Sequence, residues 1–394
     1  MRKVLAVFGA LALTGCMSTG TGNAPMTLER EGVTATQPAT PRSPEEVQVL
    51  FWDEAQRSAR FRDMEDWFAG LDVEAAPSPR TLPRGTAFSA PLKARLDTLV
   101  SETGAAGLMV LQDGRIRYEN YGLGFGPEGR WTSFSVAKSF TSTLLGAALE
   151  DGFITSLDEK VTRYIPGLRG SAYDDVTIRQ LAMMSSGVAW NEDYTDPASD
   201  VARMTEFQER YGRQAIVAQM RSLPREAPAG TKWVYKTGET NLLGLLVEEA
   251  AGMPLAAYAK EKIVDPAGFA GDLFWMTDPR GGNIGGCCLS IRLSDYARFG
   301  QFVLEGGTGV VSPGWFAEAT APRYDVGAPG FGYGYQWWTY PGGNFGAQGI
   351  FGQSITILPQ QRMVIALVGN WPTATSRDYR NRMLEAAALL AAES

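Results

Sequence analysis

The sequence contains no histidine among its 394 residues, and this absence excludes several kinds of active site. Neither a Ser-His-Asp nor a Cys-His triad can be built without an imidazole. Most catalytic zinc and non-haem iron sites also depend on imidazole ligands. The Gly-x-Ser-x-Gly elbow of α/β-hydrolases is absent as well. An activated nucleophile in this chain therefore needs a different base.

Cysteine is scarce, because the chain has only Cys16, Cys287 and Cys288. Three thiols cannot form a Cys₄ zinc site or hold an iron–sulfur cluster alone. A vicinal disulfide needs a strained local backbone, so we expect Cys287 and Cys288 to be two buried thiols. We expect the protein to use neither a metal nor a cofactor.

Basic residues are outnumbered, with 36 Lys and Arg against 43 Asp and Glu, which gives a net charge of −7. An acidic chain with scattered basic residues is a poor candidate for binding the phosphate backbone of nucleic acids. The 44% hydrophobic content is typical of a globular protein. The length suits one large domain or two closely packed lobes.

The N-terminus carries a short apolar run from Val4 to Leu13 after two basic residues. A run of this size is too short for a membrane helix, which needs about 20 residues, and is typical of a secretory signal. The Leu-Thr-Gly-Cys sequence at 13–16 resembles the lipobox of bacterial lipoproteins, which implies a signal peptide at 1–15 and lipidation of Cys16. Because Met17 follows instead of Asp, we predict an outer-membrane lipoprotein facing the periplasm. The alternative is an ordinary secretory signal with an incidental cysteine.

Composition divides the rest of the chain into three parts. Residues 16–44 are rich in small and polar residues and predict a flexible tether. Residues 45–84 predict a helical extension followed by a Pro-rich connector, with a helix start from Ser43 to Glu46. Residues 85–394 form the main domain.

The main domain shows strand patterns at both ends and mostly helical patterns between them. Asp113-Gly114 between two apolar runs predicts a β-hairpin. This arrangement predicts an α+β fold in which one antiparallel sheet is built from both termini, flanked by helices, with an inserted and mostly helical lobe. The expected elements are a hairpin over 107–121, a helix over 135–150, a mostly helical region over 155–335, strands over 354–358 and 363–368, and a helix over 375–392.

Ser135-Val136-Ala137-Lys138 is the only Ser-x-x-Lys in the chain. Positions i and i+3 share one face of a helix, so the Ser135 hydroxyl and the Lys138 amine can meet. A serine hydroxyl is a weak nucleophile and needs a base. A lysine whose pKa is depressed by burial and by a helix N-terminus is the natural substitute for histidine. By itself the motif is about as frequent as chance predicts.

Two further segments raise the significance of the Ser-x-x-Lys motif: Trp233–Gly244, which contains Tyr235, and Phe345–Gln353. In this order and spacing the three segments resemble the serine β-lactamase and penicillin-binding-protein superfamily. The resemblance is greatest to the branch of class C β-lactamases, family VIII-type esterases and 6-aminohexanoate-dimer hydrolases, and the loop at 184–194 resembles the amide hydrolases in particular. The resemblance covers about residues 85 to 390 and implies a β-lactamase/transpeptidase-like fold.

The resemblance implies roles for individual residues. Ser135 would be the acylated nucleophile, and Lys138 would be its base or would polarise Tyr235. Tyr235 would act as general acid and base towards the leaving group. The backbone N–H groups of Ser135 and Ile350 would form the oxyanion hole. Tyr194 would lie in a loop that closes on the substrate. The further candidates for substrate binding are Trp190, Thr237, Gln348 and Gly349.

Two positions depart from the superfamily pattern. Thr237 replaces an asparagine two residues after the tyrosine, and its hydroxyl has a shorter reach. Ala347 replaces the lysine or histidine of the third motif, in a region that binds the substrate carboxylate in β-lactamases and DD-peptidases. The loss of such a donor removes about 1.5–3 kcal/mol when the acceptor is charged. We therefore predict weak or absent β-lactamase and carboxypeptidase activity.

The loop from Glu192 to Asp200 carries four carboxylates, at Glu192, Asp193, Asp196 and Asp200. It is either a solvated loop with Asp turn chemistry or a site where one carboxylate binds the amine end of a substrate. Lys236, beside Tyr235, is interpreted as a surface charge, and electrostatic tuning of Tyr235 is the alternative.

Three functional hypotheses follow. The first is a lipid-anchored serine hydrolase that cleaves a small-molecule ester or amide through an acyl-enzyme. The second is a β-lactamase or a peptidoglycan DD-peptidase, which Ala347 disfavours. The third is a non-catalytic protein that binds cell-wall fragments or a partner protein, which the presence of Ser135, Lys138 and Tyr235 disfavours.

Overall fold

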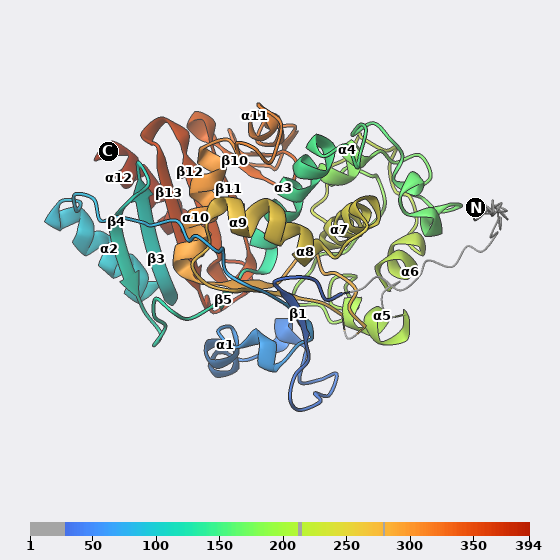
Figure 1. Cartoon of the computed structure of the whole chain (residues 1–394), viewed down its shortest axis with the longest axis horizontal. Helices are drawn as coiled ribbons and strands as arrows, with labels where there is room; N and C mark the ends of the chain where they lie inside the picture. Colours follow the sequence, from blue (N-terminus) through green and yellow to red (C-terminus); the bar gives the residue numbers. More distant parts are fainter. Residues whose placement is uncertain (1–27, 212–214, 279) are drawn as a thin grey trace, which may run out of the picture.

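The computed structural model describes residues 28–211, 215–278 and 280–394 (Figure 1). Within these residues the strands form an eight-stranded and a five-stranded antiparallel sheet. The larger sheet has the order β4-β3-β13-β12-β11-β10-β9-β8. Its strands are β3 (Ala105–Gln112), β4 (Arg115–Tyr121), β8 (Tyr324–Asp325), β9 (Gly332–Tyr333), β10 (Trp338–Tyr340), β11 (Asn344–Gln348), β12 (Ser354–Leu358) and β13 (Met363–Gly369).

The centre of this sheet joins the two ends of the main domain. Strand β13 pairs with β3 in a register that runs from Met363 opposite Gln112 to Gly369 opposite Ala105. The turn between β3 and β4 places Asp113 and Gly114 at φ 51° and 70°, the left-handed conformation that a tight hairpin turn requires. The predicted hairpin and the predicted sheet from both termini are therefore confirmed.

Helices cover both faces of the larger sheet, so its central strands β3, β12 and β13 are buried on both sides. On one face, α2 (Ala90–Glu102) and α12 (Arg377–Ala392) pack on Leu108 and Ile365. On the other face, α10 (Leu293–Leu304) packs on Val364, where Gly300 leaves room for the strand. The alternation of Val364 and Ile365 between the two faces follows from the two-residue repeat of a strand.

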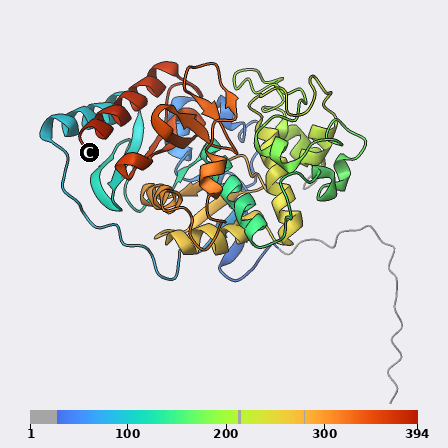
Figure 2. The ribbon, with the colours of Figure 1, turned by 90° about the horizontal axis from the view of Figure 1, so that it is seen from above.

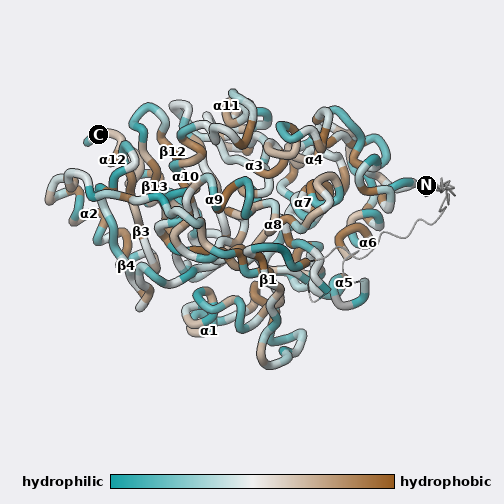
Figure 3. Tube along the Cα trace, in the orientation of Figure 1, coloured by the Kyte–Doolittle hydropathy of each residue, from teal (hydrophilic) through white to brown (hydrophobic). Residues whose placement is uncertain are grey.

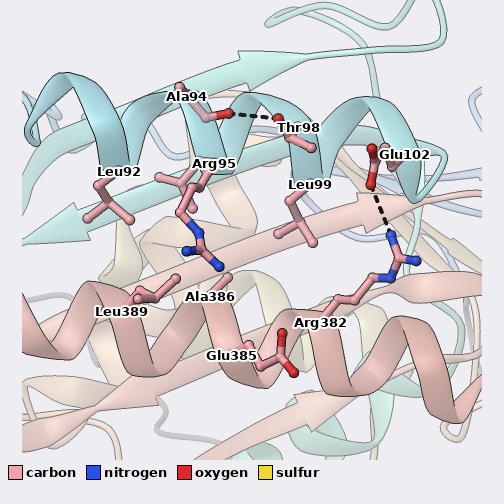
Figure 4. Close-up of a pocket in the computed structure, with 11 residues that line it drawn as sticks. Leu92, Ala94, Arg95, Thr98, Leu99, Glu102, Arg382, Glu385, Ala386 and Leu389 are labelled. Carbon is pink, nitrogen blue, oxygen red and sulfur yellow. Dashed lines mark hydrogen bonds and ion pairs between the residues drawn. The ribbon is translucent and has the colours of Figure 1, made fainter.

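A groove between α2 and α12 is visible in Figure 4, where Arg382 reaches across to Glu102 with a 3.0 Å N–O distance. Its lining residues all come from these two helices. The groove is therefore separate from the predicted catalytic residues.

The smaller sheet was not predicted from the sequence. It has the order β1-β2-β6-β7-β5 and consists of β1 (Val33–Thr36), β2 (Gly70–Val73), β5 (Trp131–Thr132), β6 (Leu273–Met276) and β7 (Leu289–Ile291). Strand β1 falls in the range predicted as a tether, so the expectation of unstructured chain is wrong for residues 33–36. Val33 is buried and pairs with Val73, which gives this stretch tertiary contacts that its composition does not show.

The N-terminal extension also differs from its prediction. Ser43 and Glu46 form reciprocal hydrogen bonds between side chain and backbone, at 2.8 and 3.3 Å, but the chain there makes a turn and not a helix. The first helix of the extension, α1 (Glu54–Arg60), begins instead after Asp53, which caps it. Between them lies only the 3-10 turn η1 (Val49–Phe51), of which Val49 and Leu50 line a cavity described below.

The helical lobe lies beside the larger sheet, as Figures 1 and 2 both show. It confirms the predicted insertion of mostly helical chain, interrupted by β6 and β7. Helices α3 and α7 are buried along most of their length and form its centre. Its helices are α3 (Ala137–Glu150), α4 (Ile178–Ala182), α5 (Met204–Tyr211), α6 (Ala215–Arg221), α7 (Thr237–Ala251), α8 (Leu255–Ala259), α9 (Asp265–Ala267) and α11 (Trp315–Ala319).

Hydrophobic stretches gather along the central strands and helices, while the outer loops are hydrophilic (Figure 3). Over the described ranges, no individual helix is both long and apolar enough to cross a bilayer. Helix α7 and residues 255–267 meet the length and composition criteria only as a pair, which is bent by 78°.

Candidate active site

Ser135 lies in the 3-10 turn η3 (Phe134–Val136), directly before α3. Ser133 N donates to the carbonyl oxygen of Leu289 in β7 at 2.7 Å, and Leu289 N donates to Ser133 Oγ at 3.1 Å. These two hydrogen bonds fix the start of the turn. Phe134 has φ 42°, a left-handed conformation that is unfavourable for a residue with a side chain. Burial of its ring against Phe61 and Phe351 holds it there. The residue before Ser135 is thus strained, as is common at functional sites.

Lys138 lies one helical turn after Ser135 and is only 1% exposed. Its Nζ donates to Ser135 Oγ at 3.2 Å, to Thr237 Oγ1 at 3.0 Å and to the carbonyl oxygen of Gly286 at 2.7 Å. Burial lowers the pKa of Lys138 to about 8, although the charge of Glu192 opposes this shift. A substantial fraction of the amine is therefore neutral near pH 8.

Tyr235 is the third residue that the structure brings to this point. The Lys138 Nζ lies 5.2 Å from the centre of its ring. The ring stacks on Trp338 and meets Tyr333 edge-on, at centroid distances of 5.6 and 6.0 Å. Burial raises the pKa of Tyr235, and so does Glu192, while a hydrogen bond from Ser135 lowers it. The phenol is therefore protonated at neutral pH and is suited to donate a proton.

Glu192 organises three of the residues that the sequence proposes for substrate binding. Its carboxylate accepts hydrogen bonds from Trp190 Nε1, from the hydroxyl of Tyr194 (2.8 Å) and from Thr237, through both N (2.9 Å) and Oγ1. Because Thr237 Oγ1 also accepts from Lys138, the carboxylate is connected to the lysine through one hydroxyl. The polar atoms of these three residues are therefore engaged within the protein.

The other carboxylates of this loop form local bonds. Asp193, Asp196 and Asp200 each accept a hydrogen bond from a backbone N–H group of the same loop. This is the turn chemistry of the first alternative considered for the loop. Glu192 is the exception, because its carboxylate bonds to Tyr194 and to Thr237 of α7. Its position in a run of acidic residues does not indicate these contacts.

Strand β11 brings the third motif close to Ser135. A Cβ atom on Gly349 would lie 2.5 Å from the carbonyl oxygen of Ser133, so only glycine permits this approach. Ile350 follows, and both it and Ser135 line the same cavity. Gln348 donates to the hydroxyl of Tyr340 at 2.7 Å, which turns its amide towards β10.

The cavity at Ser135 has a volume of about 480 Å³. Part of its wall comes from the N-terminal extension, which the sequence analysis assigned to a tether and to packing helices. The apolar residues at 47, 49 and 50 were the signal that could have indicated this role. The extension contributes Gln37, Pro38, Pro41, Arg42, Pro44, Val47, Val49, Leu50, Trp67, Phe68 and Ala69.

The interpretation of Lys236 as a surface charge is wrong. Its side chain is fully buried, and its Nζ lies 3.7 Å from Glu239 in an ion pair. Glu239 also accepts from Ser186 and from Tyr173 (3.3 Å). Successive residues of an extended segment point to opposite sides, so that Tyr235 faces the site while Lys236 faces the interior. Burial raises the pKa of Glu239, and the charge of Lys236 opposes that shift.

The expectation of two buried thiols is also wrong, because Cys287 and Cys288 are joined in a disulfide. Cys288 is buried and has φ 70°, so the backbone does adopt the unfavourable conformation that the expectation considered too costly. Both cysteines line the cavity.

Arg380 is a further residue that the sequence analysis did not identify. It lies in the first turn of α12, with its guanidinium 4.8 Å from the ring of Trp371. Burial lowers its pKa to about 10, and its charge lowers the pKa of Tyr235. In the part of the chain that the structure describes, no group of three or more His, Cys, Asp or Glu residues is arranged to hold a metal ion.

A serine and a lysine one helical turn apart, with a tyrosine from a second segment, lie where a helical lobe meets an antiparallel sheet. This combination defines the class of serine hydrolases with the β-lactamase/transpeptidase-like fold. The chain belongs to the Beta-lactamase family, whose sequence model matches residues 92–390. The family and the fold expected from the three motifs are therefore confirmed.

Relatives with similar sequences are hydrolases. The chain is 29% identical over 307 residues to the 6-aminohexanoate-dimer hydrolase of Paenarthrobacter ureafaciens, an alignment that covers 72% of this chain and 77% of the relative. It is 26% identical over 182 residues to a β-lactamase of Pseudomonas fluorescens, covering 44% and 47% of the two chains. The protein is accordingly a serine hydrolase.

Solved structures share the fold. One from Bacillus anthracis, assigned as a 6-aminohexanoate-dimer hydrolase, has a TM-score of 0.76 at 22% identity, covering 89% of this chain and 98% of that one. A D-stereospecific amidohydrolase from Streptomyces has a TM-score of 0.59 at 21% identity, covering 75% of this chain and 97% of that one.

Proposed function

We propose that the protein hydrolyses an ester or an amide through an acyl-enzyme on Ser135. The observation that carries the proposal is the 3.2 Å contact between the Ser135 hydroxyl and a buried Lys138 amine whose pKa is lowered to about 8. A neutral amine at this distance can take the proton of the hydroxyl.

In the acylation step, the Ser135 oxygen forms a bond to the substrate carbonyl carbon, and its proton passes to Lys138. The N–H groups of Ser135 and Ile350 stabilise the negative charge that develops on the carbonyl oxygen. The bond to the leaving group then breaks. Tyr235 gives its phenolic proton to the leaving group and is reprotonated by the Lys138 ammonium.

In the deacylation step, a water molecule attacks the acyl carbon. Its proton passes to Lys138, and the Ser135 oxygen recovers a proton when the acyl group leaves as a carboxylic acid. The same residues serve both steps, so that the enzyme returns to its starting protonation state.

Glu192 is proposed as a positioning residue. It holds Thr237, which in turn accepts a hydrogen bond from Lys138, and its charge raises the pKa of Lys138. The carboxylate therefore acts on the reaction through the lysine and not by contact with the substrate.

Hydrolysis of an amide is supported by the name of the Paenarthrobacter relative. Activity on β-lactams or peptidoglycan is the weaker candidate, because Ala347 is buried and supplies no cation. An anchored location is a further proposal: the lipobox-like sequence supports acylation of Cys16, which lies outside the described residues.

Labelling with a fluorophosphonate probe tests the proposed function. The full chain and Ser135→Ala are treated in parallel, with heat-denatured protein as the control for non-specific reaction, and the adduct is mapped by mass spectrometry. Modification at Ser135 that the substitution abolishes is the expected result. Equal labelling of the native and denatured protein would overturn the proposal.

A further inference from the structure

The N-terminal extension and the catalytic serine face the same cavity. Within residues 37–50, the side chains of Val47, Val49 and Leu50 form an apolar part of its wall, and Trp67 and Phe68 extend this surface. The match to the family begins only at residue 92. This wall is therefore built by chain that precedes the residues matched by the family model.

The wall is fixed in place from both ends. On one side β1 pairs with β2 in the smaller sheet. On the other side Trp52 is buried, and its Nε1 donates to the carbonyl oxygen of Glu46 at 2.8 Å. A segment held at both ends presents its side chains in defined positions, which is the requirement for selecting substrates by shape.

The cavity has little charge. Among the described residues that line it, Arg42 is the only charged one and none is acidic. Arg42 is itself engaged, since its guanidinium lies 4.0 Å from the ring centre of Trp67 and donates to the carbonyl oxygen of Asp66 at 3.1 Å. The nearby carboxylate of Glu192 is held by Trp190, Tyr194 and Thr237. The cavity thus offers no counter-charge to an ammonium group.

The position of Tyr235 relative to the cavity indicates which part of the substrate the cavity would hold. Ser135 and Ile350 line it, whereas Tyr235 is not among its lining residues and stacks on Trp338 instead. Because Tyr235 protonates the leaving group in the proposed mechanism, the leaving group departs on the side of Tyr235. The acyl part of the substrate then occupies the cavity.

We propose that residues 37–50 form the specificity-determining wall of an apolar acyl pocket, so that the enzyme accepts neutral, apolar acyl chains and discriminates against acyl chains that end in an amine. This inference rests on the proposed acyl-enzyme function. It assigns to the extension a role in substrate selection and gives the chemical class of the acyl group.

The first test is the dependence of the rate on acyl length. The kcat/KM values of the full chain for p-nitrophenyl acetate, butyrate and octanoate are compared with those of Leu50→Trp, which fills the cavity. We expect the ratio of the octanoate value to the acetate value to fall at least about tenfold in the variant. Phe51→Ala is the matched control, because Phe51 lies in the same turn but is 45% exposed and does not line the cavity.

The second test compares two substrates of equal length, p-nitrophenyl heptanoate and the p-nitrophenyl ester of 6-aminohexanoic acid. We expect wild-type kcat/KM to favour the neutral chain by at least about tenfold, because the ammonium group must be desolvated without a partner. Equal rates for the two esters would overturn the assignment of a neutral acyl pocket.

The outcomes separate this inference from the function on which it rests. If a fluorophosphonate does not label Ser135 in the wild type, the proposed function fails and the pocket assignment fails with it. If Ser135 is labelled but the length profile is the same in wild type and Leu50→Trp, only the pocket assignment is overturned. Melting temperatures confirm that the variants are folded, and Val47→Trp replaces Leu50→Trp if the latter does not fold.

Discussion

Catalysis at the scale of single residues depends on how the environment of Lys138 sets its proton affinity. Removal from water favours the neutral amine, whereas the charge of Glu192 favours the ammonium form. The first effect is the larger, so the pKa lies below its ordinary value. In the proposed mechanism, the balance between these two effects allows Lys138 to act as a base near neutral pH.

The acylation rate is expected to rise with pH through a midpoint near the Lys138 pKa of about 8. Below that midpoint the amine is increasingly protonated and cannot accept the Ser135 proton, so the rate should fall about tenfold per pH unit. The rate of Ser135 labelling, measured from about pH 6 to about pH 9, checks this. A flat profile over that range would show that Lys138 is not the base.

Substitution Glu192→Gln removes the charge that raises the Lys138 pKa, so the midpoint of the same profile should move to lower pH by about one unit. A purely structural role would lower the rate at every pH without moving the midpoint. Asp193→Asn is the control, because Asp193 is exposed in the same loop and bonds within it. An unshifted midpoint in Glu192→Gln would remove Glu192 from the mechanism.

Ala347 predicts little activity on β-lactams. The residue is buried at 1% exposure and places a methyl group where a cation would bind a substrate carboxylate. Nitrocefin hydrolysis should therefore be slow compared with the hydrolysis of simple esters by the same preparation. Nitrocefin turnover at the level of class C β-lactamases would contradict this expectation.

At the scale of elements, the start of α7 holds residues of the site in position. Tyr235 and Lys236 are neighbours in sequence, yet Tyr235 lies beside Lys138 and Lys236 forms a buried pair with Glu239. Thr237 then begins the helix and contacts both Lys138 and Glu192. Three successive residues thus connect the catalytic groups to the interior of the lobe.

Glu239→Gln should destabilise the fold by about 3–5 kcal/mol, because it leaves the buried Lys236 charge without a partner. Urea unfolding monitored by tryptophan fluorescence measures the change. The exposed pair of Lys232 and Glu226 gives the comparison, since Glu226→Gln should cost less than about 1 kcal/mol. If Glu239→Gln lowers the free energy of unfolding as little as Glu226→Gln does, the buried pair is not important for stability.

At the scale of the whole molecule, the extension that precedes the family domain is part of the enzyme. Residues 33–36 complete the smaller sheet, and residues 37–50 line the cavity. Any lipid anchor at Cys16 would therefore precede an ordered segment that reaches the active site.

Acylation of Cys16 predicts that the wild-type protein sediments with membranes and that Cys16→Ser is released into the soluble fraction. Mass spectrometry of the N-terminal peptide from the membrane fraction should find a modified cysteine as its first residue. Equal distribution of the two proteins between fractions would favour the ordinary secretory signal.

The sequence was sufficient to predict the antiparallel sheet from both termini, the helical insertion and the family. These features depend on short-range patterns: a two-residue repeat in strands, the Asp113-Gly114 turn and a serine three residues before a lysine at the start of a helix. The predictions that were wrong concern residues whose environment comes from distant segments. Lys236 was assigned to the surface, Cys287 and Cys288 were expected to be free thiols, and Ser43 was expected to start a helix.

The sequence by itself determined which side chains are available for chemistry. The absence of histidine left lysine as the candidate base, and the Ser-x-x-Lys spacing placed Lys138 beside Ser135. Tertiary structure alone decided their environment, because Lys138 and Thr237 are 99 residues apart and Thr237 and Glu192 are 45 apart. Burial and charge act through space, so the pKa of the base and the wall of the cavity arise only when the chain is folded.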